Sequence, residues 1–114
     1  MAKTITINEV NFTSLTGQKA LDLLNDYARA WHRGDCELWH VYGRCSEAKR
    51  RAFDYCIAIM NKVGGRGYYI ASYNTCVFTF VYVIDDGDFF YVVKETRDNR
   101  YIAHFSKAEY GHLI

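Results

Sequence analysis

The sequence predicts an α+β domain of two layers: an antiparallel, four- to five-stranded meander sheet with N-terminal helices packed on one face. Between residues 17 and 63 the apolar residues recur at helical spacing, whereas after Gly67 they alternate with a period of two. The chain has 114 residues, of which 50% are hydrophobic and 24% are charged. This size and composition predict a single globular domain spanning residues 1–114.

The first segment, residues 4–8, alternates and is rich in β-branched residues, which predicts a short strand, followed by a loop over residues 8–16. Thr16 is a suitable N-cap for a helix that should end at Gly34. The apolar stripe expected along this helix comprises Leu21, Leu24, Ala28 and Trp31.

Two further helices are expected. Residues 36–42 form a short one between Asp35 and Gly43. The next begins after Ser46 and ends at Gly64-Gly65, and its expected stripe comprises Ala52, Cys56, Ile59 and Val63. Each of these helices should end at its C-terminal glycine, Gly43 or Gly64, because glycine adopts the left-handed backbone without a Cβ clash.

The second half predicts four strands, at residues 68–73, 75–84, 89–96 and 101–105. Both faces of the 75–84 strand are apolar, so it should lie in the interior of the sheet. An Asp-Gly pair within residues 85–88 predicts a type I′ hairpin turn. The last strand is followed by Ser106-Lys107-Ala108-Glu109, which has the form of a capping box and predicts a final helical turn.

If the helices cover one face of the sheet, the surplus aromatic residues should lie on the other face, as Tyr and Phe from the strands at 68–73, 75–84 and 89–96. The chain contains ten Tyr, seven Phe and two Trp. An uncovered aromatic face indicates a partner surface. The alternatives are that the N-terminal strand, the loop over residues 8–16 or a second copy of the chain covers it, the last giving a homodimer.

Four residues within one stretch could form a metal site, which we call the zinc set: His32, Cys36, His40 and Cys45. Two thiolates and two imidazoles make a tetrahedral zinc site, and four protein ligands would make that zinc structural. The spacing matches no standard zinc-finger pattern. The alternative is that the two histidines are ordinary surface or half-buried residues and both cysteines are small apolar core residues.

The remaining thiols offer little for catalysis. Cys56 falls on an apolar helical stripe and Cys76 alternates with Phe78 and Phe80, so both are expected in the core. A small hydrolase would need one cysteine folded against a histidine. No phosphate-binding loop, serine elbow or zinc-protease motif is present, so we expect a protein that is not an enzyme.

A basic cluster surrounds the start of the third helix and comprises Arg44, Lys49, Arg50 and Arg51. Cations there oppose the helix dipole, which suggests an acidic partner or anion. The alternative is a solvated basic face balanced by Glu47 and Asp54.

Charge and apolar runs limit the other classes of partner. The formal net charge is only +1, and residues 67–84 contain no Lys or Arg, which argues against direct nucleic-acid binding. No apolar run approaches the ~20 residues of a membrane span, and the N-terminus has no secretory signal. We therefore expect a cytoplasmic protein with reduced cysteines and no membrane partner.

The middle of the chain resembles a family of small, largely uncharacterised proteins from phages and mobile elements of Gram-positive bacteria. The resemblance covers about residues 42–95 and is carried by Tyr42-Gly43-Arg44, Ser46, Ala48-Lys49, Ala52, Tyr55-Cys56, Gly67, Ile70, Ser72, Asn74-Thr75 and Val77-Phe78. Members often carry another residue, such as proline, at the position of Cys45, so the resemblance does not support zinc as a family feature.

Small phage proteins of this type include inhibitors of host defence, among them anti-CRISPR proteins. Together with the missing catalytic motifs, the resemblance implies an inhibitor in the host bacterial cytosol that blocks a type II CRISPR effector nuclease by occlusion. Aromatic anchors with arginine at the rim would supply the binding energy. The expected partner-binding residues are Tyr42, Arg44, Lys49, Arg50, Arg51, Tyr68, Tyr73 and Tyr82. The alternative function is a zinc-stabilised regulatory or nucleic-acid-binding domain.

Overall fold

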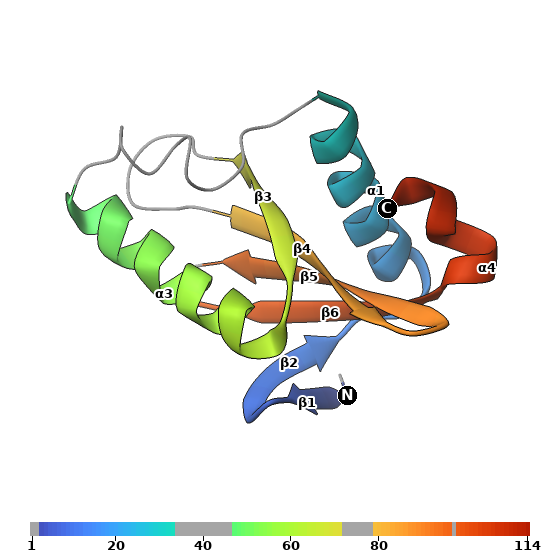
Figure 1. Ribbon diagram of the computed structural model, residues 1–114, viewed down its shortest axis with the longest axis horizontal. Helices are drawn as coiled ribbons and strands as arrows, with labels where there is room; N and C mark the ends of the chain where they lie inside the picture. Colours follow the sequence, from blue (N-terminus) through green and yellow to red (C-terminus); the bar gives the residue numbers. More distant parts are fainter. Residues whose placement is uncertain (1–2, 34–46, 72–78, 97) are drawn as a thin grey trace.

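The computed structural model describes residues 3–33, 47–71, 79–96 and 98–114. It is an α+β domain with a six-stranded sheet in the order β1-β2-β6-β5-β4-β3 (Figure 1). The strands are β1 (Thr4–Ile7), β2 (Val10–Ser14), β3 (Arg66–Ala71), β4 (Thr79–Asp86), β5 (Phe89–Thr96) and β6 (Arg100–Ser106). The helices are α1 (Gly17–Arg33), α3 (Glu47–Val63), α4 (Lys107–Tyr110) and a terminal 3₁₀ turn, η1 (Gly111–Leu113).

The N-terminal segment forms a β-hairpin rather than one strand and a loop. β1 and β2 pair antiparallel around a two-residue turn in which Asn8 and Glu9 have positive φ, the pattern of a type I′ turn. The expected loop over residues 8–16 therefore contains a strand. The Asn8 side chain donates a 2.7 Å hydrogen bond to the Lys62 carbonyl, which fastens the turn to the end of α3.

The sheet is mixed, so the expectation of a purely antiparallel meander is wrong. β6, β5, β4 and β3 pair antiparallel in succession, as expected for the second half of the chain. β2, however, pairs parallel to β6 through Thr13↔Tyr101 and Ser14↔Ile102. The hairpin thus extends the sheet beyond the last strand. β4 lies between β3 and β5, which confirms its interior position.

One face of the sheet packs against α1. Its residues alternate along the strands and include Val81, Val92 and Ala103, which form a buried cluster with α1. The helix bounds match the expected 17–33, but the stripe is turned by about one residue. The buried positions are Ala20, Leu23, Leu24, Tyr27 and Ala30, while Leu21 is 38% exposed. The expected stripe is confirmed at Leu24 but wrong at Leu21, and it left out Tyr27.

The opposite face packs against α3, which corrects the expected two-layer arrangement with both helices on one side. Val63, Ile59 and Met60 of α3 pack with Tyr82, Val93 and Ile102 and with the N-terminal hairpin. The sheet therefore lies between two helices over part of its area (Figure 1). The expected α3 stripe is confirmed at Cys56 and Val63, which are both buried.

Glycines end α3 where expected. Gly64 has a φ of 81°, and the N–H groups of Gly64 and Gly65 both donate to the Met60 carbonyl at 2.9 Å. A Cβ built on Gly65 would lie 2.5 Å from Cδ2 of Tyr82. The missing side chain therefore lets the β3 entry point lie directly against the Tyr82 ring.

The two turns near the C-terminus differ from expectation in detail. Gly87 alone has a positive φ in the β4–β5 turn, which is the pattern of type II′ rather than type I′. α4 follows β6 as expected, but Ser106 makes no side-chain capping hydrogen bond. Instead the Lys107 N–H donates to the Asp88 carbonyl at 3.0 Å, which ties α4 to the β4–β5 turn.

Candidate interaction surface

An aromatic row lies on the α3 face of the sheet, beyond the end of that helix. Phe89 and Tyr91, two residues apart on β5, lie on the same face of the sheet. His104 of β6 lies directly opposite Tyr91 in the strand register. The rings of Phe89 and His104 stack with centroids 4.7 Å apart, and those of Tyr91 and His104 lie 5.1 Å apart. Phe89 is 43% exposed and His104 is also exposed. We call these three residues the aromatic row.

Carboxylates gather at the same end of the sheet, in what we call the open corner, residues 85–91 and 104–110. Its acidic residues are Asp85, Asp86, Asp88 and Glu109, all of them exposed. Lys107 supplies the compensating charge by donating to both oxygens of Asp85, at 2.6 and 2.7 Å. This contact holds the pKa of Asp85 below its ordinary value. Four carboxylates against one ammonium give the open corner a formal charge of −3, although the chain as a whole carries +1.

A groove of about 460 Å³ adjoins the open corner on the α1 side of the sheet. It lies between β6, the start of α1 and α4, and its main apolar lining residues are Leu15, Ala20, Leu21, Phe105 and Tyr110. Phe105 and Tyr110, which both line the groove, meet edge to face with ring centroids 5.1 Å apart. The groove therefore combines a fixed aromatic wall with the partly exposed side chain of Leu21.

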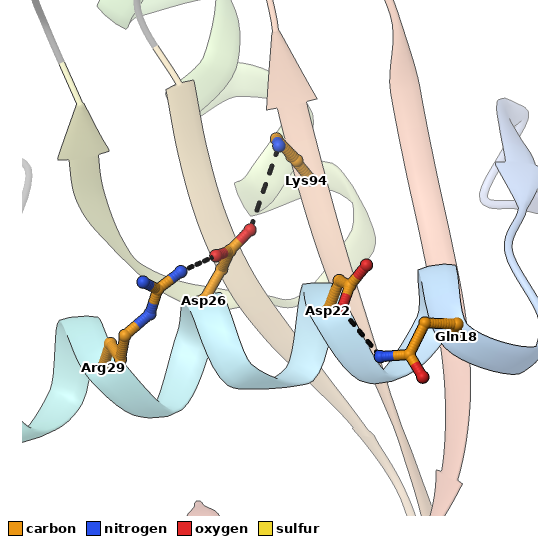
Figure 2. Close-up of polar contacts among 5 residues, drawn as sticks. All are labelled: Gln18, Asp22, Asp26, Arg29 and Lys94. Atoms are coloured by element: carbon orange, nitrogen blue, oxygen red, sulfur yellow. Dashed lines mark hydrogen bonds and ion pairs between the residues drawn. The ribbon is translucent and has the colours of Figure 1, made fainter.

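A second, charged cleft of about 350 Å³ lies between α1 and the β5–β6 end opposite the open corner. Figure 2 shows Asp26 of α1 between Arg29 on the same helix and Lys94 of β5. Lys94 Nζ lies 3.9 Å from Asp26 Oδ2, and Gln18 donates a 2.9 Å hydrogen bond to Asp22 one turn earlier. Charges of both signs alternate here and compensate one another, so the cleft has no strong preference for one charged ligand.

A buried carboxyl lies beneath α3. Glu95 is 1% exposed and faces Tyr82, Cys56 and Arg100. Its Oε1 is 3.1 Å from Nε of Arg100, but the two atoms are not aligned for a hydrogen bond. Burial raises the pKa of Glu95 to about 7, against the opposing effect of the neighbouring Tyr82 hydroxyl.

The exposed side of this buried cluster is a small polar pocket of about 220 Å³, at the end of the sheet away from the open corner. Arg100 forms its wall, donating a hydrogen bond to the Tyr55 hydroxyl and lying 5.4 Å from the centre of the Tyr55 ring. Tyr55 itself is 52% exposed on α3. The arginine thus separates the Glu95 carboxyl from solvent.

The residues expected to bind a partner are distributed unevenly. Tyr82 is wrong as an anchor, because it is 1% exposed and packs beneath α3. Arg51 is exposed and pairs with Glu47 at 3.0 Å, which fits the alternative of a solvated basic face. Of the others, Lys49 and Arg50 lie in α3 and Tyr68 in β3, whereas Tyr42, Arg44 and Tyr73 lie outside the described residues.

The zinc set also falls mostly outside the described residues. His32 lies in α1, while Cys36, His40, Cys45 and the short helix expected over 36–42 belong to the stretch not described. Among the described residues no group of three or more potential metal ligands occurs. Zinc binding by the zinc set therefore stays a prediction.

Cys56 is confirmed as a core residue. It is 2% exposed, and burial together with the charge of Glu95 raises the pKa of its thiol to about 12. A thiol that keeps its proton is a poor nucleophile. The other core cysteine expected, Cys76, lies outside the described residues.

Sequence reasoning missed Glu95, and it expected exposed Tyr and Phe from the 89–96 strand without singling out Phe89, Tyr91 and His104. The row was detectable, since Phe89 and Tyr91 lie two residues apart directly after an acidic turn, which places them at a strand end.

Within the described part of the chain, no helix is long and apolar enough to cross a membrane. Comparison of the chain with protein-family models, curated proteins and solved structures finds no match.

Proposed function

We propose that this protein is a non-enzymatic inhibitor that binds a host defence protein in the bacterial cytosol. In its most concrete form it is a phage anti-CRISPR protein that blocks a type II CRISPR effector nuclease by occlusion. The phage origin and the class of target come from the family resemblance of residues 42–95. What the described residues add is a surface suited to holding a partner.

The observation that carries the proposal is the exposed aromatic row in the open corner. Interface hot spots are enriched in aromatic residues that fill a pocket of the partner, with charged residues at the rim. Phe89 exposes 43% of its surface, and its ring is held by stacking on His104, so little conformational entropy is lost when a partner covers it. The carboxylates around the row supply the rim.

Occlusion requires only that the bound protein occupy a surface its target needs for guide RNA, target DNA or a moving domain. The open corner replaces Tyr82 as the anchor of that contact. Arg51, Lys49, Arg50 and Tyr68 stay candidate contacts in a second region, together with the residues outside the described part of the chain.

The test is a pull-down of candidate effector nucleases followed by an interference assay in cells. The wild-type chain should retain a nuclease and restore plaque formation by a targeted phage. Phe89→Ala should weaken retention by about 2 kcal/mol, the size of an aromatic hot spot. Tyr55→Ala is the matched control, because it removes an exposed aromatic residue of α3 that lies away from the open corner. No retained nuclease and no loss of interference would end the proposal.

A further inference from the structure

The sheet contains a gap beside the second half of β6. β2 pairs with β6 only at Tyr101 and Ile102, and the chain then turns away at Leu15 into α1. Within the described residues, β6 therefore has a strand on both sides at its start and on the β5 side alone at its end. We propose that this gap is a docking slot for an extended, basic segment of the partner protein, which adds as a strand beside β6. The inference rests on the protein-binding function proposed above.

The direction of the backbone groups follows from the observed hydrogen bonds. The Leu15 N–H donates to the Ile102 carbonyl at 2.7 Å, so the backbone groups of Ile102 point toward β2. The Lys107 N–H donates to Asp88 at 3.0 Å, so Lys107 points toward β5. Because these directions alternate along a strand, the N–H and C=O of His104 point into the gap.

No other backbone group among the described residues hydrogen bonds to that side of His104. An unpaired strand edge is a template for another strand, and main-chain hydrogen bonds supply affinity in this mode of peptide recognition. The slot is short, because α4 begins directly after Ser106. An added segment of about four residues would fill it.

Side chains of an added strand would point alternately to the two faces of the sheet. On the α1 face they would enter the 460 Å³ groove, whose lining includes Leu21, Phe105 and Tyr110. Leu21 is one of the exposed large hydrophobic residues of the described chain, and an apolar side chain in the groove would cover it. The slot thus has both a main-chain and a side-chain component.

Charge selects a basic occupant. The open corner carries a formal charge of −3, and no ion pair among the described residues neutralises Asp86, Asp88 or Glu109. Asp88 lies at the end of β6 on the β5 side, across that strand from the gap, since its carbonyl accepts from Lys107, whereas Glu109 follows β6 in α4. The net negative charge of the open corner would attract a lysine or arginine just past the apolar residue of the partner. A second copy of the chain would instead bring two acidic corners together, which disfavours self-association.

The test uses the full-length protein and a dye-labelled octapeptide in which valine and threonine alternate and two lysines follow. Binding is measured by fluorescence polarisation. His104→Pro removes the edge N–H yet keeps the pairing with β5, since proline is tolerated where the N–H faces outward. His104→Ala is the matched variant, because both lose the imidazole and only the proline variant loses the donor. The proline variant should bind about 10-fold more weakly than the alanine variant.

A second set of measurements leaves the protein unchanged. Two N-methylated peptides are compared, one methylated at the odd-numbered amides and one at the even-numbered amides. Because only one of these sets faces β6, methylation should weaken binding about 10-fold in one peptide and leave it within about 2-fold in the other. Asp88→Lys should weaken binding, whereas Asp98→Lys, the same charge change at the opposite end of the sheet, should not. Equal weakening in the two N-methylated peptides, or no binding at about 1 mM peptide, would overturn the slot.

The remaining outcomes separate this inference from the proposed function. A concentration-dependent dimer that His104→Pro abolishes would assign the gap to a second copy and overturn the choice of a partner segment. If a host nuclease binds equally well to the proline and alanine variants, the slot is wrong while the inhibitor proposal stands. If N-methylation weakens peptide binding at only one set of alternate amides but no host protein is retained, the slot stands and the inhibitor proposal fails.

Discussion

Replacing the buried carboxyl by an amide, Glu95→Gln, should change how stability depends on pH. Burial raises the pKa of Glu95 from 4.5 to about 7 in the folded chain. The folded state therefore holds this proton more tightly than the unfolded state does, and stability falls as the pH rises through this window. At 1.36 kcal/mol per pKa unit, the full loss is about 3 kcal/mol, most of which falls between about pH 5 and pH 8.

Glutamine stays neutral throughout and removes this dependence. Urea unfolding followed by circular dichroism, at several values between about pH 5 and pH 8, should show the unfolding free energy of the variant gaining about 2 to 3 kcal/mol on that of the wild type across the window. The control is Asp98→Asn, which makes the same carboxyl-to-amide change at an exposed position in the neighbouring turn. Parallel profiles for Glu95→Gln and the wild type would refute the argument that desolvation dominates over the Arg100 contact.

Three further predictions concern separate parts of the chain. Gly65→Ala should destabilise the fold by about 1–3 kcal/mol because its Cβ would collide with Tyr82; Gly111→Ala, where the nearest atom lies at 3.7 Å, should change the unfolding free energy by less than about 0.5 kcal/mol in the same denaturation assay. Lys107→Met should raise the pKa of Asp85 toward its ordinary value, measured by NMR titration of the carboxyl carbon, because the ammonium that stabilises its charged form is gone. The zinc set predicts about one zinc ion per chain by elemental analysis and a lower Tm on chelation, and less than about 0.2 ions would remove it.

The sequence predicted the elements far better than their arrangement. Helix and strand bounds follow from local signals: period, caps and the glycines at residues 64 and 65. β2 was missed because Glu9 adopts a positive φ, which a non-glycine residue other than Asn or Asp rarely does. The signal that could have found it is the alternation of Val10 and Phe12, both of which are buried.

The faces of the sheet were assigned wrongly, although the sequence held a clue. Both faces of β4 are apolar, which argues for cover on both sides and not on one. The α3 cover is what buries Tyr82, and the approach depends on Gly65 having no side chain. Which face each helix takes depends on the chirality and length of connections, and hydrophobic periodicity does not encode these.

Glu95 could not be recognised from sequence for a similar reason. Glu95 lies on the same face of β5 as Val93, two residues earlier. An isolated Glu at a strand end normally reaches solvent. In the described part of the chain, Arg100, five residues later on the paired strand, and Tyr55 from α3 close its solvent side. The aromatic row, by contrast, follows from the period of two along β5 and from α3 ending short of Phe89.

The two ends of the sheet should behave as independent sites. Glu95 and Phe89 lie six residues apart on β5, and at about 3.3 Å per residue this is a separation of about 20 Å. Substitutions further apart than about 10 Å with no shared partner usually add within about 0.5 kcal/mol. Glu95→Gln should therefore leave partner affinity unchanged, and its stability effect should add to that of Phe89→Ala in a double-mutant cycle. A coupling above about 1 kcal/mol would mean that the buried carboxyl and the open corner respond to one shared rearrangement of the sheet, which this packing does not provide.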